Sequence, residues 1–81
     1  MEEDLKIWER ICSGDASAMK ALHDRYYYQL YLYGKKMCHN TLLLDEAVSD
    51  CFIKLWTRRN ELMIVRSVKY YLFLMFINLT V

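Results

Sequence analysis

The absence of proline, together with the presence of only two glycines, limits the folds open to this chain more than any other feature of its sequence. All-β folds need a turn at every reversal of direction, and such turns draw heavily on proline and glycine. Here Gly14 and Gly34 are the only glycines in 81 residues. Hydrophobic residues make up 56% of the chain, which is too many for a disordered segment. We therefore predict a folded, all-α protein.

The length of the chain predicts a single domain over residues 1–81. A chain of this size buries only about 60% of its unfolded surface, so one core must serve the whole molecule. Rossmann, TIM-barrel and two-domain cleft enzymes need longer chains and are excluded.

Apolar residues recur at three- and four-residue steps in four segments, which predicts a compact bundle of four helices. Asp15 and Ser67 are predicted N-caps because their side-chain oxygens can accept hydrogen bonds from the first free backbone N–H groups. The helices are expected at about 3–12, 16–38, 42 or 45 to 59, and 68–79. The side chains expected to face the core are Leu5, Trp8, Ile11, Cys12, Met19, Leu22, Tyr26, Leu30, Tyr33, Met37, Leu44, Val48, Cys51, Leu55, Val68, Leu72, Met75 and Leu79.

The last of these helices is apolar on all of its faces. Besides its inward stripe it carries Tyr71, Phe73, Leu74, Phe76 and Ile77. A helix of this kind is either buried on every side or displayed to a partner. We expect Leu74, Phe76 and Ile77 to form a partner surface for another protein, for a second copy of the chain through this helix, or for further chain.

Residues suited to catalysis or to metal binding are few. His23 and His39 are the only histidines, and neither a two-histidine helical motif nor a phosphate-binding glycine loop is present. The three cysteines, Cys12, Cys38 and Cys51, are odd in number and lack the spacing of a zinc site, so we expect buried or incidental reduced thiols. No catalytic residue, metal site or cofactor is predicted.

Charge is segregated along the second half of the chain, although the net charge is only +1. Asp45, Glu46 and Asp50 lie toward the start of the third expected helix, where they would complement the helix dipole. Five cations against Glu61 then give residues 54–69 a local charge of +4, which favours phosphate contact over the alternative of a solvated basic helix end. These cations are Lys54, Arg58, Arg59, Arg66 and Lys69.

Several features favour a cytoplasmic protein without a membrane span. The three residues that follow Met1 are all acidic, whereas a secretory signal needs a basic start. The longest uncharged run, 70–81, would rise only about 18 Å as a helix, which is too short to cross a bilayer.

Three segments in this order resemble region two of the extracytoplasmic-function sigma factors of bacterial RNA polymerase. They are 18–31 (AMKALHDRYYYQLY), 45–56 (DEAVSDCFIKLW) and 65–73 (VRSVKYYLF), and they span nearly the whole chain. The phrase from Phe52 to Trp56, with paired acids before it and 58–62 (RRNEL) after it, looks especially like members of the family found in Bacteroidetes.

The resemblance implies a helical domain that binds core RNA polymerase and the minus-ten promoter element and helps to open DNA. In the family, the third helix docks on the clamp helices of the largest polymerase subunit, and the connection and last helix capture a flipped base and contact the separated strand. Many members are held by an anti-sigma protein, which is a further expected partner. Carried over to this chain, the polymerase-binding positions are Asp45, Glu46, Ser49, Asp50 and Lys54. The DNA-binding positions are Arg58, Arg59, Asn60, Arg66, Lys69 and Asn78.

The chain departs from the family pattern in three ways. Ser49 stands where the family commonly has glutamine. Leu74, Phe76 and Ile77 stand where the family usually has basic or small residues that face DNA, while Asn78 fits. We also expect the C-terminal helix-turn-helix domain of complete members to be absent from this chain. An alternative function is therefore a protein-interaction or self-associating helical module that derives from a sigma factor and has lost promoter recognition.

Overall fold

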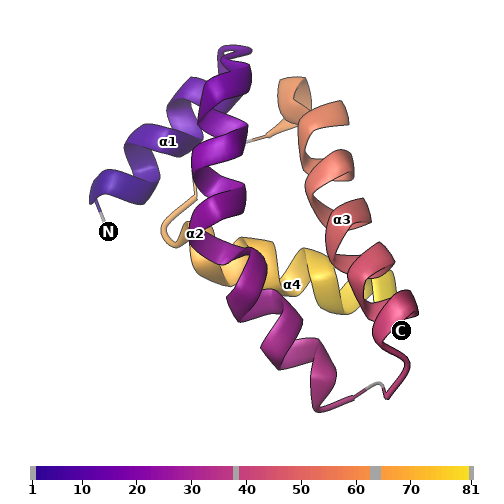
Figure 1. Cartoon of the computed structure of the whole chain (residues 1–81). Coiled ribbons are helices and arrows are strands. Elements are labelled where there is room, and N and C mark those ends of the chain that lie inside the picture. Colours follow the sequence, from indigo (N-terminus) through magenta and orange to yellow (C-terminus); the bar gives the residue numbers. More distant parts are fainter. Residues whose placement is uncertain (1, 38, 63–64, 81) are drawn as a thin grey trace.

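The chain is all-helical in the computed structural model, which describes residues 2–37, 39–62 and 65–80, and of Glu2 and Thr80 only the backbone. No strand occurs within these residues, so the predicted all-α bundle of four helices is confirmed (Figure 1). The elements are α1 (Glu2–Cys12), α2 (Ala16–Lys35), α3 (Thr41–Thr57), the short 3-10 helix η1 (Arg59–Glu61) and α4 (Val68–Thr80).

Side-chain caps set the starts of three helices. Asp15 accepts a hydrogen bond from the backbone N–H of Ser17 at 3.0 Å, and Ser67 Oγ accepts one from Tyr70 at 3.1 Å, so both predicted N-caps are confirmed. Asn40 caps α3 by accepting from the N–H groups of the two residues after Thr41, at 3.1 and 3.2 Å. The turn between α1 and α2 contains Gly14 at φ 92°, a left-handed conformation that favours glycine.

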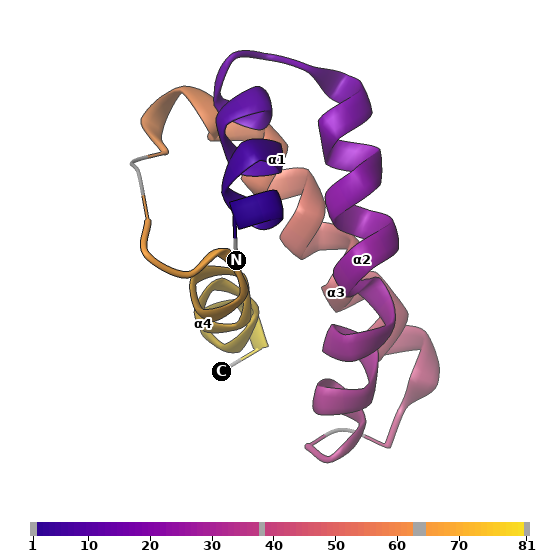
Figure 2. The same cartoon turned by 90° about the vertical axis from the view of Figure 1, so that its left-hand side faces the viewer.

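α2 packs against both α1 and α3, and α4 runs across them at a steep angle, packing mainly on α3 (Figures 1 and 2). Because α4 crosses its neighbours, its first turns lie behind α2 in Figure 1 and its last turns lie behind the start of α3. A shallow channel between α3 and α4 is thereby left on the outside of the bundle.

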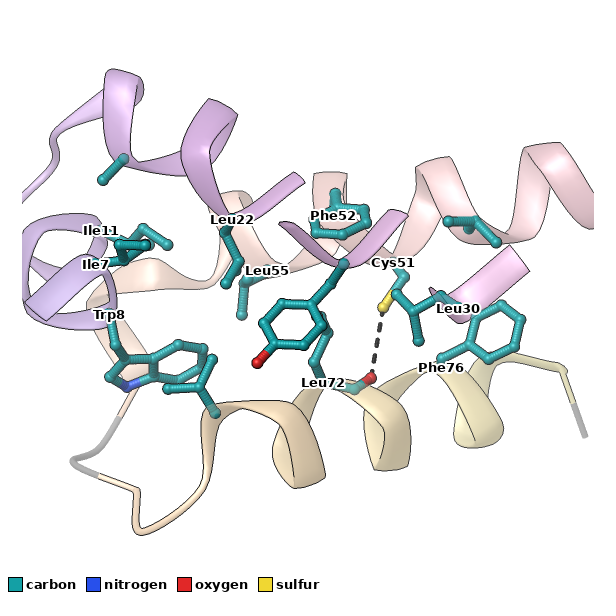
Figure 3. Close-up of a cluster of buried hydrophobic side chains, with 14 of the residues drawn as sticks. Ile7, Trp8, Ile11, Leu22, Leu30, Cys51, Phe52, Leu55, Leu72 and Phe76 are labelled. Atoms are coloured by element: carbon teal, nitrogen blue, oxygen red, sulfur yellow. Dashed lines mark hydrogen bonds between the residues drawn. The ribbon is translucent and has the colours of Figure 1, made fainter. Parts of the chain in front are cut away.

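The core is formed by residues from all four helices (Figure 3). The predicted inward positions of α3 are fully or almost fully buried. In α2 and α4 the buried residues instead follow strict four-residue rows, which are the ridges that interdigitate when helices cross steeply. The rows are Ala18, Leu22, Tyr26, Leu30 and Gly34 in α2, and Val68, Leu72 and Phe76 in α4. Met37, expected inside, is 56% exposed beyond the end of α2, and Tyr33, Met75 and Leu79 are half-buried.

Gly34 lies inside α2 at the point where α3 and α4 both approach that helix. A Cβ atom at this position would lie 2.9 Å from Cζ of Phe76 and still closer to Cδ1 of Leu44. The missing side chain is therefore what allows these two residues to pack against α2.

A buried acid joins α1 to α2. Asp4 is 3% exposed and accepts a hydrogen bond from the phenol of Tyr26 through Oδ2. Its other oxygen, Oδ1, lies 3.3 Å from Nε of Arg25, which also pairs with Glu3 at 2.9 Å. The first turn of α1 is thus attached to the middle of α2 by polar contacts as well as by apolar packing.

Candidate interaction surface

The acids of α3 lie outside the first turn of that helix. Because α3 begins at Thr41, Asp45 and Glu46 fall in its second turn and Asp50 near its middle, and its first turn contains no acid. The field of a helix dipole acts mainly on the first and last turns. The interpretation of these three carboxylates as dipole partners is therefore wrong, and their positions need another explanation.

Four charged side chains form a line along α3 and its C-cap, which we call the charged ridge: Glu46, Asp50, Lys54 and Arg58. They follow one another at four-residue steps, so they occupy one ridge about 18 Å long. All four are exposed, and no ion pair joins any of them to another side chain in the described part of the chain. The half of the ridge toward the start of α3 is acidic and the half toward its end is basic.

The charged ridge borders a groove between α3 and α4, which we call the α3–α4 groove. Its first part, about 460 Å³, is lined by acids of the ridge together with Leu43, Ala47 and Leu79. Its second part, about 360 Å³, is lined by Lys54, Arg58, Tyr71, Leu74, Met75 and Asn78. Lys54 and Leu79 belong to both parts, so the two lie end to end along the ridge.

Large apolar side chains are exposed along the same groove. Leu43, Ile53 and Leu74 are 57%, 60% and 44% exposed, and each lines one of the two parts. An apolar patch with a charged border is typical of a protein interaction site. Leu43 and Ile53 were not among the sequence candidates, although Leu43 lies three residues before Glu46 and Ile53 three residues after Asp50, which places them on one face.

The expected partner surface of α4 is only partly present. Leu74 is exposed and lines the groove, and Ile77 is half-buried. Phe76 is fully buried, because it occupies the four-residue row that packs on α2 beside Gly34. The assignment of Phe76 to a partner surface is therefore wrong, and this residue belongs to the core.

The expected DNA-binding residues are divided among different faces. Arg58 and Asn78 line the second part of the α3–α4 groove with Lys54. Arg59 instead stacks its guanidinium 4.1 Å from the ring centroid of Trp56 and donates to the carbonyl of that residue at 2.9 Å. Trp56 lines a separate hollow between α2 and α3, so Arg58 and Arg59 serve different surfaces.

The remaining expected DNA contacts lie on η1 and around the start of α4. Lys69 extends over the ring of Phe73 at 5.8 Å, and that ring packs edge-on against Tyr33 of α2. Asn60 is exposed on η1 and Arg66 is exposed just before α4. The middle of the expected base-capturing connection, residues 63–64, lies outside the described residues. The local charge of +4 is thus not one continuous patch.

The thiols of Cys12 and Cys51 and the imidazole of His23 have structural surroundings. Burial raises the pKa of the Cys51 thiol to about 12, and Cys51 Sγ donates to the carbonyl of Leu72 at 3.8 Å (Figure 3). Burial also raises the pKa of Cys12. His23 packs its ring on Tyr27 and Phe52, with centroids 4.7 and 4.9 Å apart. Among the residues that the structure describes, which do not include Cys38, no three metal-ligating side chains come together.

Comparison with protein-family models, with curated proteins and with solved structures finds no match to this chain. The likeness to sigma-factor region two therefore depends on the ordered residues of the sequence. Among the described helices, none combines the length and the apolar character needed to cross a membrane.

Proposed function

We propose that this chain is a transcription initiation domain that binds core RNA polymerase and the minus-ten promoter element and helps to open DNA. The observation that carries the proposal is the exposed row of Glu46, Asp50 and Lys54 on α3. Lys54 lies in the last turn of α3, where it suits the helix dipole, but the dipole does not explain the two acids, and no ion pair within the described residues engages any of the three. In the family that the sequence resembles, the corresponding helix is the one that docks on polymerase.

The chemistry of α3 suits a helical partner with basic side chains, such as the clamp helices of the largest polymerase subunit. Exposed Leu43 and Ile53 would supply an apolar centre, and the acids would supply a charged rim. Asp45 and Ser49 each precede a ridge residue by one position and share one row of α3, from which they would contact the flank of the same partner.

Contact with separated DNA is assigned to the second part of the α3–α4 groove. Lys54 and Arg58 offer charges for phosphates, Asn78 offers an amide, and the Tyr71 ring offers a surface on which a base can stack. Arg59, Lys69, Arg66 and Asn60 lie outside this groove and are not assigned to the strand that it holds. An anti-sigma partner would be expected to cover these same surfaces.

The test is binding of the chain to a clamp-helix fragment of the largest polymerase subunit, measured in a pull-down. We expect the unmutated chain to bind and Asp50→Arg to abolish binding, because the substitution places a cation against basic partner side chains. Glu9→Arg, an equal change of charge at an exposed position of α1, is the matched control and should bind normally. No binding by the unmutated chain would refute the proposal.

A second candidate function is favoured by the exposure of Leu74 where the related proteins usually have a basic residue. In that case the chain is a protein-interaction module that has lost promoter recognition. Binding to single-stranded DNA distinguishes the two functions. The interaction module would not bind single-stranded DNA but would still bind its protein partner.

A further inference from the structure

The order of charges on the charged ridge has a geometric consequence. Glu46 and Asp50 occupy one half, and Lys54 and Arg58 occupy the other, at equal four-residue steps. A two-fold axis between Asp50 and Lys54 would therefore place each acid opposite a cation of an antiparallel copy. Glu46 would face the partner's Arg58, and Asp50 would face the partner's Lys54. A parallel arrangement would instead place like charges together.

The ridge charges do not neutralise one another within the chain. Asp50 precedes Lys54 by four residues, which is the favourable order for an ion pair along a helix, yet the two side chains form none. On α2 an ion pair at the same four-residue spacing does form, between Lys20 and Asp24 at 3.0 Å, although its order is the less favourable one. The ridge charges are consequently available to another molecule.

Apolar groups lie where an antiparallel copy would need them. Leu43 lines the acidic end of the α3–α4 groove and Leu74 lines its basic end, so the two-fold axis brings Leu43 of each copy toward the other copy's Leu74. Ile53, near the axis, is 60% exposed. Each copy therefore presents an apolar strip beside a charged border, which is the pattern of an isologous interface.

We propose that the chain forms an antiparallel, two-fold dimer in which α3 of each copy packs along the α3–α4 groove of the other. The occupant is a second copy because the charge order complements itself only under a two-fold rotation. This dimer goes beyond the proposed function and covers Glu46, Asp50 and Lys54, so that dimer formation and polymerase binding exclude each other. It also differs from pairing through α4, whose Phe76 is buried.

The experiment is sedimentation equilibrium of the full chain alone, without polymerase or DNA, so that failure of the dimer and failure of the proposed function are read separately. The unmutated chain should pass from monomer to dimer as its concentration rises. The variant Glu46→Lys/Asp50→Lys and the variant Lys54→Glu/Arg58→Glu should each dissociate at least about tenfold more readily, because every cross-dimer pair becomes a repulsion.

Mixing the two variants provides the decisive measurement. One variant then carries a fully basic ridge and the other a fully acidic one, so a heterodimer should form at least as strongly as the unmutated dimer and should weaken with added salt. Glu9→Lys/Glu61→Lys and Lys6→Glu/Lys35→Glu make the same changes of net charge at exposed positions off the ridge, and should leave the dimer intact. Circular dichroism of each variant verifies its helical fold.

Three results would overturn the dimer. They are a monomer at every concentration, ridge variants that dimerise as well as the controls, and a mixture of the two ridge variants that remains monomeric while both are folded. Ile53→Asp offers a test that does not depend on the charged residues, since it removes the apolar centre and should also give a monomer.

Discussion

Tyr26 on α2 donates a hydrogen bond to the buried carboxylate of Asp4 on α1, across 22 residues of sequence. Both residues are almost fully buried, at 6% and 3% exposure, so neither water nor another described side chain can replace the phenol as donor to Oδ2. Oδ1 already lacks a hydrogen bond among the described residues, although Arg25 lies near it. The stability of the α1–α2 pair therefore depends on this contact.

Tyr26→Phe should lower the free energy of unfolding by about 1–3 kcal/mol, because it leaves a buried carboxylate oxygen without its donor. Urea denaturation followed by circular dichroism measures the change. Tyr28→Phe removes the same hydroxyl at an exposed position and should change stability little. Equal effects of the two substitutions would contradict the assigned role of the contact.

Stability should also fall at alkaline pH through the same residue. Burial, and then the hydrogen bond to Asp4, raise the pKa of Tyr26 to about 12 from its ordinary 10. Between these two values the folded chain retains a proton that the unfolded chain has lost, so the free energy of unfolding decreases as pH rises through this window and is unaffected by this group below it. In Tyr26→Phe the decrease should be smaller than in Tyr28→Phe, as measured by denaturation at a series of pH values. The same slope in both variants would exclude Tyr26 as the cause.

Gly34→Ala should destabilise the fold by about 1–3 kcal/mol, because the added methyl group would overlap with Leu44 and Phe76. Alanine otherwise favours a helix over glycine, so a gain in stability would show that the neighbours can move aside. Adding Phe76→Leu to Gly34→Ala tests the cause. The double variant should lose less than the sum of the two single losses, since the smaller side chain frees the space that the methyl group needs.

The thiol of Cys51 should react with a thiol reagent only when the chain unfolds. Its side chain is fully buried and its pKa is raised to about 12, so the reactive thiolate is scarce at neutral pH. In a Cys38→Ser background, Cys12 should be labelled faster than Cys51, because it is half-buried. Mass spectrometry of labelled peptides distinguishes the two sites. Rapid labelling of Cys51 in the native chain would contradict the packing shown in Figure 3.

The salt dependence of single-stranded DNA binding should reveal how many cations act together. If all five cations of 54–69 contacted phosphates, the slope of log K against log salt would be about −3.5, whereas Lys54 and Arg58 alone give about −1.4. Because only these two line the α3–α4 groove, we expect the smaller slope. It should approach zero in Lys54→Gln/Arg58→Gln, and a slope that does not change in this variant would remove the groove from DNA binding.

Local chemistry made the helices and their starts predictable from the sequence. Asp15 and Ser67 can cap only the N–H groups next to them, and the buried positions of α3 follow from apolar spacing within a single helix. The start of α3 was less predictable, because Asn40 competes with later polar residues for the role of cap. Because α3 begins at Thr41, its acids lie outside the first turn, and the helix dipole does not explain their positions.

The candidate surface was predictable only in part. Glu46, Asp50 and Lys54 are exposed, as expected of residues that bind a partner, and their common spacing is readable in the sequence. Arg59 stacks on Trp56, only three residues away, but the hollow that Trp56 lines forms only where α2 packs beside α3. The separation of Arg58 from Arg59 therefore could not be predicted from the sequence. Hydrophobicity alone could not distinguish Phe76 from Leu74, because both are large apolar residues on a helix without a polar face.

By itself the sequence determined that the chain is helical, where its turns fall and which charges share a ridge, because capping, turn formation and helical periodicity act over a few residues. The tertiary structure alone decided which face of α4 became core. That choice depends on the steep crossing of α4 over α2, which the absence of a side chain at Gly34 allows, and crossing geometry is set by residues distant in sequence. The same crossing opens the α3–α4 groove beside the charged ridge.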